Sequence, residues 1–148
     1  MSRRAWHLTA PGSSSKQIRR VTLVVMTDLI TRLLPILHVR DPYAERDFYV
    51  QFGLRATYEG SEYPGFLAVG NDSVEFGLSR RPKADPTATG MTWQLGVSDI
   101  DAVLEACDTA GLAYQVTLEH PSPDWSYRTV SVRSPNGMDV VFEEQRAS

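Results

Sequence analysis

The sequence predicts an α+β fold in which two tandem copies of one βαβββ module form a curved sheet around a groove. Asp41 is followed twelve residues later by Gly53, and Asp99 is followed at the same spacing by Gly111. Each Asp closes a short apolar run, and each Gly ends a segment with helical character. Two copies of a unit that is too small to fold alone usually pack around a shared interior. We therefore expect a ligand in that interior.

The chain of 148 residues is long enough for one domain with a substantial core. We expect this domain over residues 26–148, with modules at about 33–79 and 91–144. Residues 80–90 hold charges and prolines and are expected to link the modules. The repeat is thus predicted to be two halves of one fold.

The first 25 residues differ in composition from the rest of the chain. Residues 1–25 hold five Arg or Lys and no acid. Their one apolar run, Val21–Met26, is too short for a secretory signal or a membrane span. We expect a disordered or mis-annotated extension, with Met26 as the true start of translation.

The net charge of the whole chain is -3, and from Met26 onward ten cations stand against 18 acids. An acidic body disfavours nucleic acid and favours cationic small molecules as partners. Cys107 is the single cysteine, which excludes an internal disulfide and is compatible with the cytoplasm as location. It follows Ile100 and Val103 at helical spacing, so we expect a buried apolar residue.

The elements of the first module follow from apolar alternation and from its breaks. Asp41 suits an N-cap, Pro42 suits the first helical position, and Gly53 suits the left-handed residue after a helix. The turn residues of 70–72 precede the last strand. The predicted elements are a strand at 33–39, a helix at 42–52, and strands at 55–59, 65–69 and 73–78.

The second module repeats this order. Asp99 and Gly111 bound its helix as Asp41 and Gly53 bound the first, and Pro135-Asn136-Gly137 gives the turn before the last strand. The predicted elements are a strand at 91–97, a helix at 100–110, and strands at 114–119, 127–133 and 139–143.

Strand alternation separates two faces of the predicted sheet. One parity is apolar and is expected to lie under the two helices: Pro35, Leu37, Val39, Val74, Phe76, Leu78, Trp93, Leu95, Val97, Val140 and Phe142. The other parity is mixed and is expected to line the groove: Leu34, Ile36, His38, Ser73, Glu75, Gly77, Thr92, Gln94, Gly96, Asp139, Val141 and Glu143. Carboxylates, an amide and an imidazole among apolar walls are typical of a small-molecule site.

The motifs "LHVRD" and "RDFYVQFGL" in the first module, with "LGVSDIDAVLEACDTAGL" and "DWSYRTVSVRSPNGMDVVFEE" in the second, resemble the vicinal oxygen chelate superfamily. Within it, the chain is most similar to the glyoxalase and bleomycin-resistance branch. The resemblance covers roughly Leu33 to Glu144, in the order and spacing of the whole unit. It implies a small-molecule ligand and a homodimer, with no nucleic acid or membrane partner.

The resemblance also assigns the four metal-binding positions of the metal-dependent members: Leu34, Thr92, Glu75 and Val141. Only Glu75 can bind a metal ion, whereas a catalytic site normally needs three or more protein ligands. No metal cofactor is therefore predicted. A divalent metal in a shifted site of His38, Glu75 and Glu143 is the alternative, but His38 lies about 13 Å along its strand from the expected position.

Six groove residues are predicted to contact the ligand: His38, Glu75, Gln94, Trp125, Tyr127 and Glu143. Trp125, in the loop before a strand, is expected either to stack on a flat or cationic ligand or to anchor that loop. Glu75 is expected to meet positive charge or to pair with a structural partner such as Arg128. A lone His at a strand end, such as His38, is more typically solvated or hydrogen-bonded.

These features predict a metal-independent binding protein that sequesters a cationic or aromatic antibiotic. The alternative is a metal-dependent lyase, isomerase or dioxygenase of the same superfamily, in which Glu75 is a metal ligand or a general base. A third reading is a dimeric scaffold or sensor that binds a metabolite. Similar folds of this superfamily serve unrelated chemistries, so the fold does not choose among them.

Overall fold

The computed structural model describes residues 4–7, 23–26, 29–89 and 91–147. The chain divides into two units, residues 1–33 and 34–148. In the first, β1 (Arg4–His7) pairs with β2 (Leu23–Met26) in an antiparallel ladder. The rest of the predicted N-terminal extension lies outside the described residues, and its status as an extension stays a prediction.

The second unit opens with a βαβββ module. Its elements are β3 (Ile36–Val39), α1 (Pro42–Val50), β4 (Arg55–Tyr58), β5 (Phe66–Gly70) and β6 (Glu75–Arg80). The sheet order is β3-β6-β5-β4, with β3 parallel to β6 and the other pairs antiparallel. Because β3 and β6 are parallel, a crossover is required between β3 and the rest of the sheet, and α1 begins it.

The second module repeats this topology. Its elements are β7 (Trp93–Gly96), α2 (Ile100–Ala110), β8 (Tyr114–Ser122), β9 (Trp125–Arg133) and β10 (Asp139–Ala147). The sheet order β7-β10-β9-β8 matches the first, with β7 parallel to β10. A short 3-10 helix, Pro86–Thr89, lies in the predicted linker. The α+β prediction of two βαβββ modules is confirmed, although among the described residues the strands form separate four-stranded sheets.

The ends of some elements differ from the prediction. Trp125 was expected in a loop, and this is wrong, since it begins β9 and pairs with Ser122 and Ala147. The pairing extends β8 and β10 beyond their predicted ends, and in β8 it continues past Pro121 through a register shift between Glu119 and Ser122. In contrast, β3 begins only at Ile36, and Leu33 is exposed.

The two helices begin in the same way. In each, the N-cap carboxylate, Asp41 or Asp99, accepts hydrogen bonds from the backbone N–H groups two and three residues on. This satisfies two of the four unpaired donors of a helix start. Gly111 has a φ of 68° after α2, the left-handed conformation that glycine adopts at least cost. None of the described helices combines the length and apolar character needed to cross a membrane.

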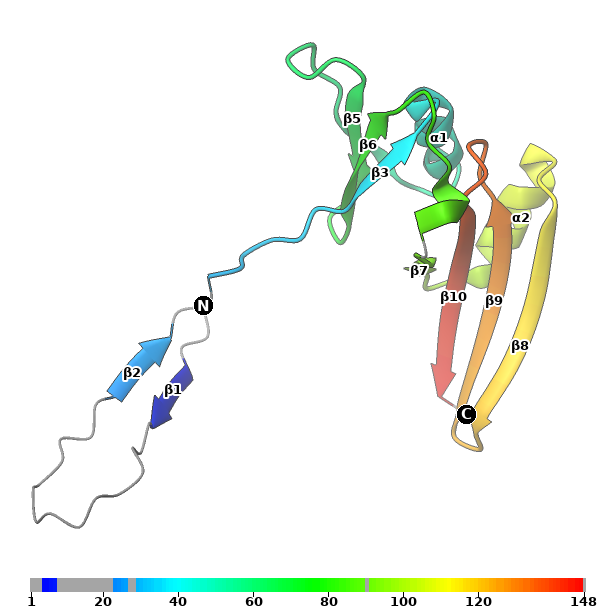
Figure 1. Ribbon diagram of the computed structural model, residues 1–148. Helices are drawn as coiled ribbons and strands as arrows, with labels where there is room; N and C mark the ends of the chain where they lie inside the picture. Colours follow the sequence, from blue (N-terminus) through cyan, green and yellow to red (C-terminus); the bar gives the residue numbers. More distant parts are fainter. Residues whose placement is uncertain (1–3, 8–22, 27–28, 90, 148) are drawn as a thin grey trace, which may run out of the picture. The chain divides into compact units, whose positions relative to one another are not determined.

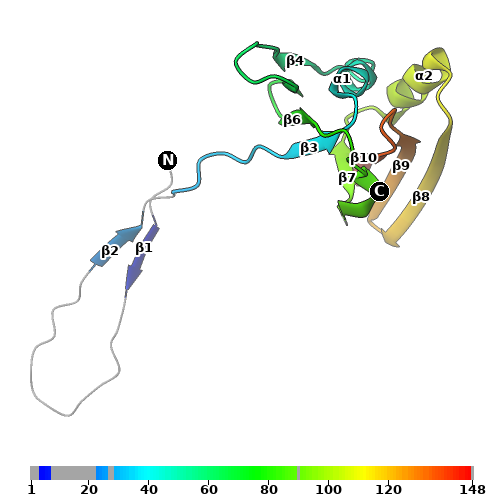
Figure 2. The same ribbon diagram turned by 45° about the horizontal axis from the view of Figure 1, so that its top comes forward.

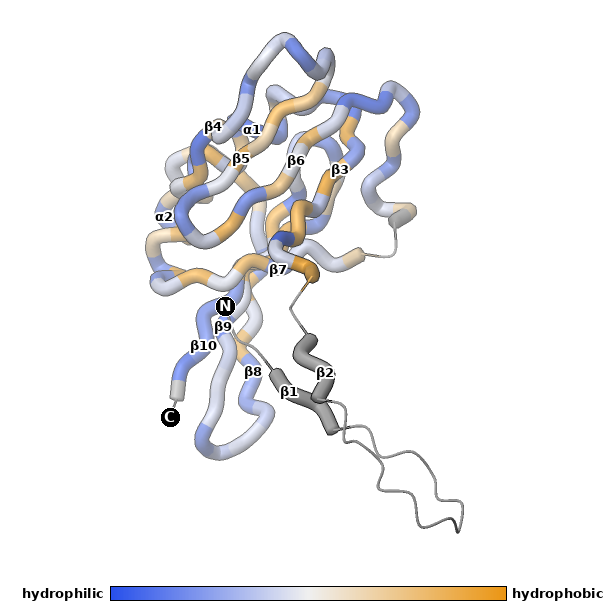
Figure 3. Tube along the Cα trace, turned by 90° about the vertical axis from the view of Figure 1, so that its left-hand side faces the viewer, coloured by the Kyte–Doolittle hydropathy of each residue, from blue (hydrophilic) through white to orange (hydrophobic). Residues whose placement is uncertain are grey.

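Both helices lie on one side of the sheets (Figures 1 and 2). The residues beneath them are mostly buried, as the apolar parity predicts, and form one cluster that includes side chains of both modules: Leu37, Val39, Phe76, Leu78, Trp93, Val140 and Phe142. Of the remaining residues of this parity, Pro35, Leu95 and Val97 are half-buried and Val74 is exposed at 42%. Figure 3 shows that hydrophobic residues are concentrated in β3, β5, β6 and β7. The ends of β8 and β9 next to the turn that joins them are hydrophilic.

Aromatic rings join the two modules. The ring centroids of Phe52 and Phe142 are 4.5 Å apart, and those of Phe76 and Trp93 are 5.0 Å apart. Such pairs add stabilisation beyond the area they bury. The core is therefore shared by the modules, as expected for two halves of one fold.

A buried polar contact also joins the modules. Asn136, in the turn before β10, donates from Nδ2 to the backbone oxygen of Asp41 at 2.8 Å, and Asp41 N–H donates to Asn136 Oδ1 at 2.8 Å. Glu45 is completely buried, and its Oε1 accepts from the backbone N–H and from Nδ2 of Asn136, both at 3.0 Å. We call this set of residues, Asn136, Asp41 and Glu45, the Asn136 clamp.

Candidate functional site

A pocket of about 490 Å³ lies between the modules on the helix side of the sheets, a volume in the range of small-molecule sites. We call it the intermodule pocket. Its apolar walls are formed by Tyr49, Phe52, Leu54, Val74, Leu95, Val97, Ala102, Val103, Ala106 and Phe142. Its polar residues are Gln51, Asn71, Ser73, Gln94, Ser98 and Asp99. Both modules contribute, so the pocket depends on their packing.

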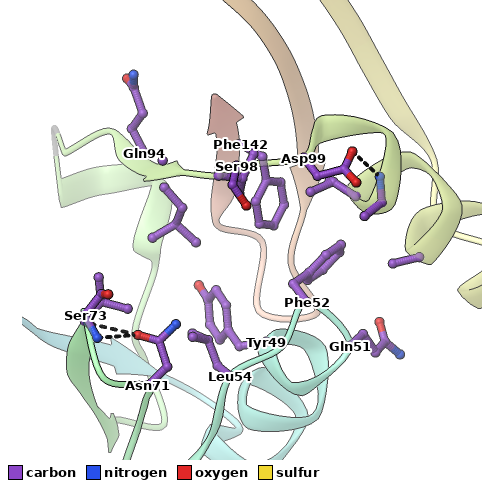
Figure 4. Close-up of a pocket in the computed structure, with 17 residues that line it drawn as sticks. Tyr49, Gln51, Phe52, Leu54, Asn71, Ser73, Gln94, Ser98, Asp99 and Phe142 are labelled. Atoms are coloured by element: carbon purple, nitrogen blue, oxygen red, sulfur yellow. Dashed lines mark hydrogen bonds between the residues drawn. The ribbon is translucent and has the colours of Figure 1, made fainter. Parts of the chain in front are cut away.

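Aromatic rings form the inner part of the pocket. Phe52 and Phe142 come from different modules and contact each other with a 41° angle between their rings. Tyr49, near the end of α1 and three residues before Phe52, packs edge-on against Phe76 at a centroid distance of 4.9 Å. Figure 4 shows Tyr49 and Phe52 below Phe142. Because Tyr49 and Phe142 are almost completely buried, half-buried Phe52 provides the accessible aromatic surface of this wall.

The Tyr49 hydroxyl is completely buried and has the Glu45 carboxylate and the Trp93 indole N–H as its polar neighbours. Burial raises the pKa of this phenol, and the nearby Glu45 carboxylate raises it further, so the group stays neutral. Glu45 Oε2 and Trp93 Nε1 are buried as well, so three polar groups are grouped beside the pocket. Figure 4 shows the Tyr49 hydroxyl directed toward the side that Gln94 and Ser98 line. Buried polar groups are normally hydrogen-bonded, and these three can satisfy one another.

The polar rim carries negative but no positive charge. No Lys, Arg or His is among the described residues that line the pocket, and Asp99 is its one acid. Asn71 accepts from the backbone N–H groups of Ser73 and Val74 at 2.8 and 3.0 Å, which closes its turn. The rim therefore favours neutral or cationic ligands over anions.

Two of the residues predicted from the sequence are brought together on the opposite, open face of the second sheet. Gln94 Nε2 donates a hydrogen bond to Glu143 Oε2. Glu143 Oε1 accepts a second bond, from Gln145 at 2.7 Å. Gln94 borders the intermodule pocket, but its amide extends away from Tyr49 and Phe52 (Figure 4).

Trp125 and Tyr127 lie on the same open face, farther along β9. Their ring centroids are 5.8 Å apart, and both side chains are half-buried. The register places Thr129 opposite Glu143 and Tyr127 opposite Gln145, so Tyr127 is one step along the face from Glu143. An aromatic pair therefore lies beside a carboxylate, outside the intermodule pocket.

The remaining predicted residues belong to the first sheet. His38 is exposed on β3, and Glu75 is half-buried at the start of β6. The suggested pairing of Glu75 with Arg128 is wrong, because Arg128 donates to Asp101 at 2.6 Å. Arg128 points to the helix side of its strand, whereas Glu75 has the open-face parity of its own sheet.

The open face of the first sheet carries an aromatic cluster that the sequence analysis did not identify as a group. Phe66 lies against Tyr58 and Tyr63, with ring centroids 6.1 and 6.4 Å away. A Cβ atom at Gly77 would approach the Phe66 ring to 2.6 Å, so only glycine allows this ring to lie on the sheet.

The residues of the metal-binding positions do not fit a metal ion. Leu34 and Val141 have hydrocarbon side chains, Thr92 has a hydroxyl, and only Glu75 has a carboxylate. In the part of the chain that the structure describes, no three His, Cys, Asp or Glu side chains are grouped to hold a metal. This donor set cannot supply the three or more ligands of a catalytic ion.

Comparison with solved structures identifies the fold. A glyoxalase/bleomycin resistance protein/dioxygenase from Alicyclobacillus acidocaldarius superposes with a TM-score of 0.61 at 12% identity, over 80% of this chain and 94% of that chain. The chain has the vicinal oxygen chelate fold. A putative glyoxalase family protein from Bacillus anthracis shares this fold with a TM-score of 0.59 at 20% identity, over 82% and 100% of the two chains.

A bleomycin-binding protein, solved in complex with bleomycin, has the same fold with a TM-score of 0.54 at 16% identity, over 80% of this chain and 100% of that chain. No protein-family model matches the sequence, and no curated protein sequence matches it. At identities this low, the structural comparison establishes the vicinal oxygen chelate fold but does not transfer the roles of individual residues.

The sequence analysis missed most of the intermodule pocket. Tyr49 and Phe52 were visible only as part of a helix motif, and Asp99 only as an N-cap. No periodicity of one module indicates where the helices of two modules leave a space. The signal that was available is the repeat itself, because it makes Asp99 the counterpart of Asp41: Asp41 contacts Asn136, whereas Asp99 lines the pocket.

Proposed function

We propose that the chain binds a small molecule that has an aromatic part and is neutral or cationic, in the intermodule pocket, without a metal ion and without chemical change. The observation that carries the proposal is the aromatic inner wall of Tyr49, Phe52 and Phe142 beneath a rim with no cation. Aromatic walls with a few polar groups are typical of ligand pockets. Sequestration of an antibiotic is the corresponding biological role, and the bleomycin-binding protein of the same fold supports it.

The charge of the chain favours the same ligands. Asp99 adds a carboxylate at the rim, and the residues from 26 onward are strongly acidic. A positive ligand would be attracted to this field and would lose little solvation at the exposed Asp99. An anion would meet repulsion without any compensating cation in the rim.

The open face offers a second region for a large ligand. Trp125 and Tyr127 provide stacking surface, and Glu143, held by Gln94, provides charge. His38 and Glu75 complete the predicted set on the other sheet. We propose these six residues as a separate ligand-contact surface on the open faces of the two sheets. A homodimer and a cytoplasmic location also remain predictions.

Matched aromatic probes test the proposal by calorimetry. 1-Naphthylmethylamine and 1-naphthoate share a ring and differ in the sign of their charge. We expect the amine to bind about fivefold more tightly, because a solvent-exposed ion pair contributes roughly 1 kcal/mol.

Two variants localise the binding. Ala106→Phe fills the pocket from α2, whereas Ala113→Phe adds the same ring at an exposed position outside it. We expect Ala106→Phe to abolish binding and Ala113→Phe to bind as the parent chain does. Equal binding by both variants, or tighter binding of the naphthoate, would contradict the proposal.

A further inference from the structure

The outer edge of the second sheet is a long strand. Among the described residues β8 pairs with β9 alone, and all nine of its residues are exposed. Figures 1 and 2 show β8 at the margin of the sheet, on the side away from the first module. The N–H and C=O groups on the outer side of such a strand form a template for pairing with another strand.

The repeat shows how this fold protects the corresponding edge of the first sheet. β4 is the outer strand there and has only four residues. Its pairing with β5 is irregular between Ala56 and Tyr58, and Arg55 at its start forms an ion pair with Asp72. Short length, irregular pairing and charge are common devices that keep an edge strand from pairing with another chain.

The first part of β8 lacks these devices. Its pairing with β9 is continuous from Tyr114 to Glu119, and the register shifts only beyond that point. From Tyr114 to Leu118 the sequence contains no charged residue and no proline. This stretch is therefore open to pairing with a further strand.

An apolar row runs along this edge on the helix side of the sheet. Val116 lies opposite Val130 of β9, whose side chain is buried in the core, so Tyr114, Val116 and Leu118 share the core side of their strand. These three side chains are 39%, 46% and 60% exposed. The Tyr114 hydroxyl donates to Asp108 of α2 at 2.9 Å, which holds the start of the strand beside the helix. A strand added at the edge would cover the row.

We propose that a second copy of this chain adds to this edge, with the two β8 strands antiparallel about a two-fold axis at Thr117. Val116 then lies opposite Leu118 of the partner subunit, and Gln115 lies opposite the partner's Glu119. The first pair joins two apolar side chains, and the second joins an amide donor to a carboxylate. Directly opposite residues lie on the same face of a sheet, so the apolar rows of the two copies meet and cover each other.

The side chains of β8 favour this register over its neighbours. An axis one residue earlier would set Glu119 opposite Ala113, which has no donor for the carboxylate. An axis one residue later would set Val116 opposite His120, and an axis at Glu119 would bring two carboxylates together. The proposed register is thus the one in which each of these residues has a matching partner.

This interface gives a structural basis to the homodimer that the family resemblance implies. Among the described residues that line the intermodule pocket, none belongs to β8. The inference therefore does not rest on the proposed function, and the two are tested separately.

Sedimentation equilibrium of the full chain tests the interface. We expect the parent chain to form dimers with a dissociation constant in the micromolar range, as is typical of a small interface. Thr117→Lys brings two like charges directly opposite each other at the axis, so dimerisation should weaken about tenfold. Thr57→Lys is the matched control, because Thr57 is an exposed threonine of the protected edge strand β4, and it should dimerise as the parent chain does.

A charge exchange then tests the register. Thr117→Glu should weaken dimerisation as Thr117→Lys does, and an equimolar mixture of the two variants should recover the association of the parent chain, because opposite charges meet at the axis. A parent chain that stays monomeric, a dimer that neither variant weakens, or a mixture that does not recover would overturn the proposal. Thr117→Lys should bind 1-naphthylmethylamine as the parent chain does, so loss of the dimer and failure of the proposed function are distinguishable.

Discussion

Replacing Asn136 with Ala tests whether a polar clamp holds the two modules together. The substitution keeps the backbone N–H bond to Glu45 and removes three side-chain bonds, two with Asp41 and one with Glu45. It leaves Glu45, a completely buried carboxylate, with one hydrogen bond instead of two. The lost bonds connect residues 91 and 95 positions apart, so they act on the module interface.

The structure sets the expected magnitude. Each neutral bond contributes about 1 kcal/mol, and the bond to the buried carboxylate contributes about 2 kcal/mol. Water can replace part of the loss at Asp41, which is exposed. We therefore expect the free energy of unfolding to fall by about 3 kcal/mol, a large part of the stability of a typical domain.

Urea denaturation followed by tryptophan fluorescence measures this change. Asn71→Ala is the matched control, because Asn71 also closes a turn before a last strand but bonds only to the backbone of Ser73 and Val74. We expect Asn71→Ala to cost about 1 kcal/mol or less. Equal losses for the two variants would refute the role of Asn136 as a clamp and reduce it to a turn residue.

Three further predictions concern single side chains. The pKa of Glu144 is lowered because Ile100 N–H donates to its Oε2 at 2.6 Å and Arg146 pairs with its other oxygen. Its stabilising effect is therefore complete above the pKa of an unfolded Glu, about 4.3, and is lost as the pH falls below it. Urea midpoints from pH 7 to pH 3 should fall less steeply for Glu144→Gln than for the parent chain. Tyr49→Phe removes a buried hydroxyl that has Glu45 and Trp93 as polar neighbours, so the free energy of unfolding in urea should fall by about 1 kcal/mol; an increase of that size would show that the hydroxyl makes no hydrogen bond in solution. Titration with Zn, Ni, Mn and Fe(II) should give no stoichiometric binding, and Glu75→Gln should not change the result, whereas one tight equivalent lost in Glu75→Gln would favour the alternative of a metal-dependent enzyme.

The helix starts show how far a local pattern extends. Asp41 and Asp99 predict their caps from residue type and from the apolar run before each, because an N-cap depends on neighbours two and three residues away. The structure confirms both, including the bonds to Tyr43 and Ala44. The strand parities are equally local, and the apolar parity is buried as expected except at half-buried Pro35, Leu95 and Val97 and at exposed Val74.

Trp125 shows where local pattern fails. Its neighbours are turn formers, so a loop was predicted, but pairing with Ala147 near the end of the chain extends the strand. The partner of Arg128 was missed for the same reason: the fold brings Arg128 to Asp101 on α2, and the predicted partner was Glu75. Partners brought by the fold from distant segments are not encoded in spacing.

The chain by itself determined the repeat, the order of elements, the helix caps and the apolar side of each sheet, because each depends on residues that are close in sequence. Only the tertiary structure decided how the modules meet. The Asn136 clamp, the Phe52–Phe142 contact and the intermodule pocket join residues from different modules. Their positions follow from the packing of two whole modules, and two copies of one sequence pattern need not make the same contact twice.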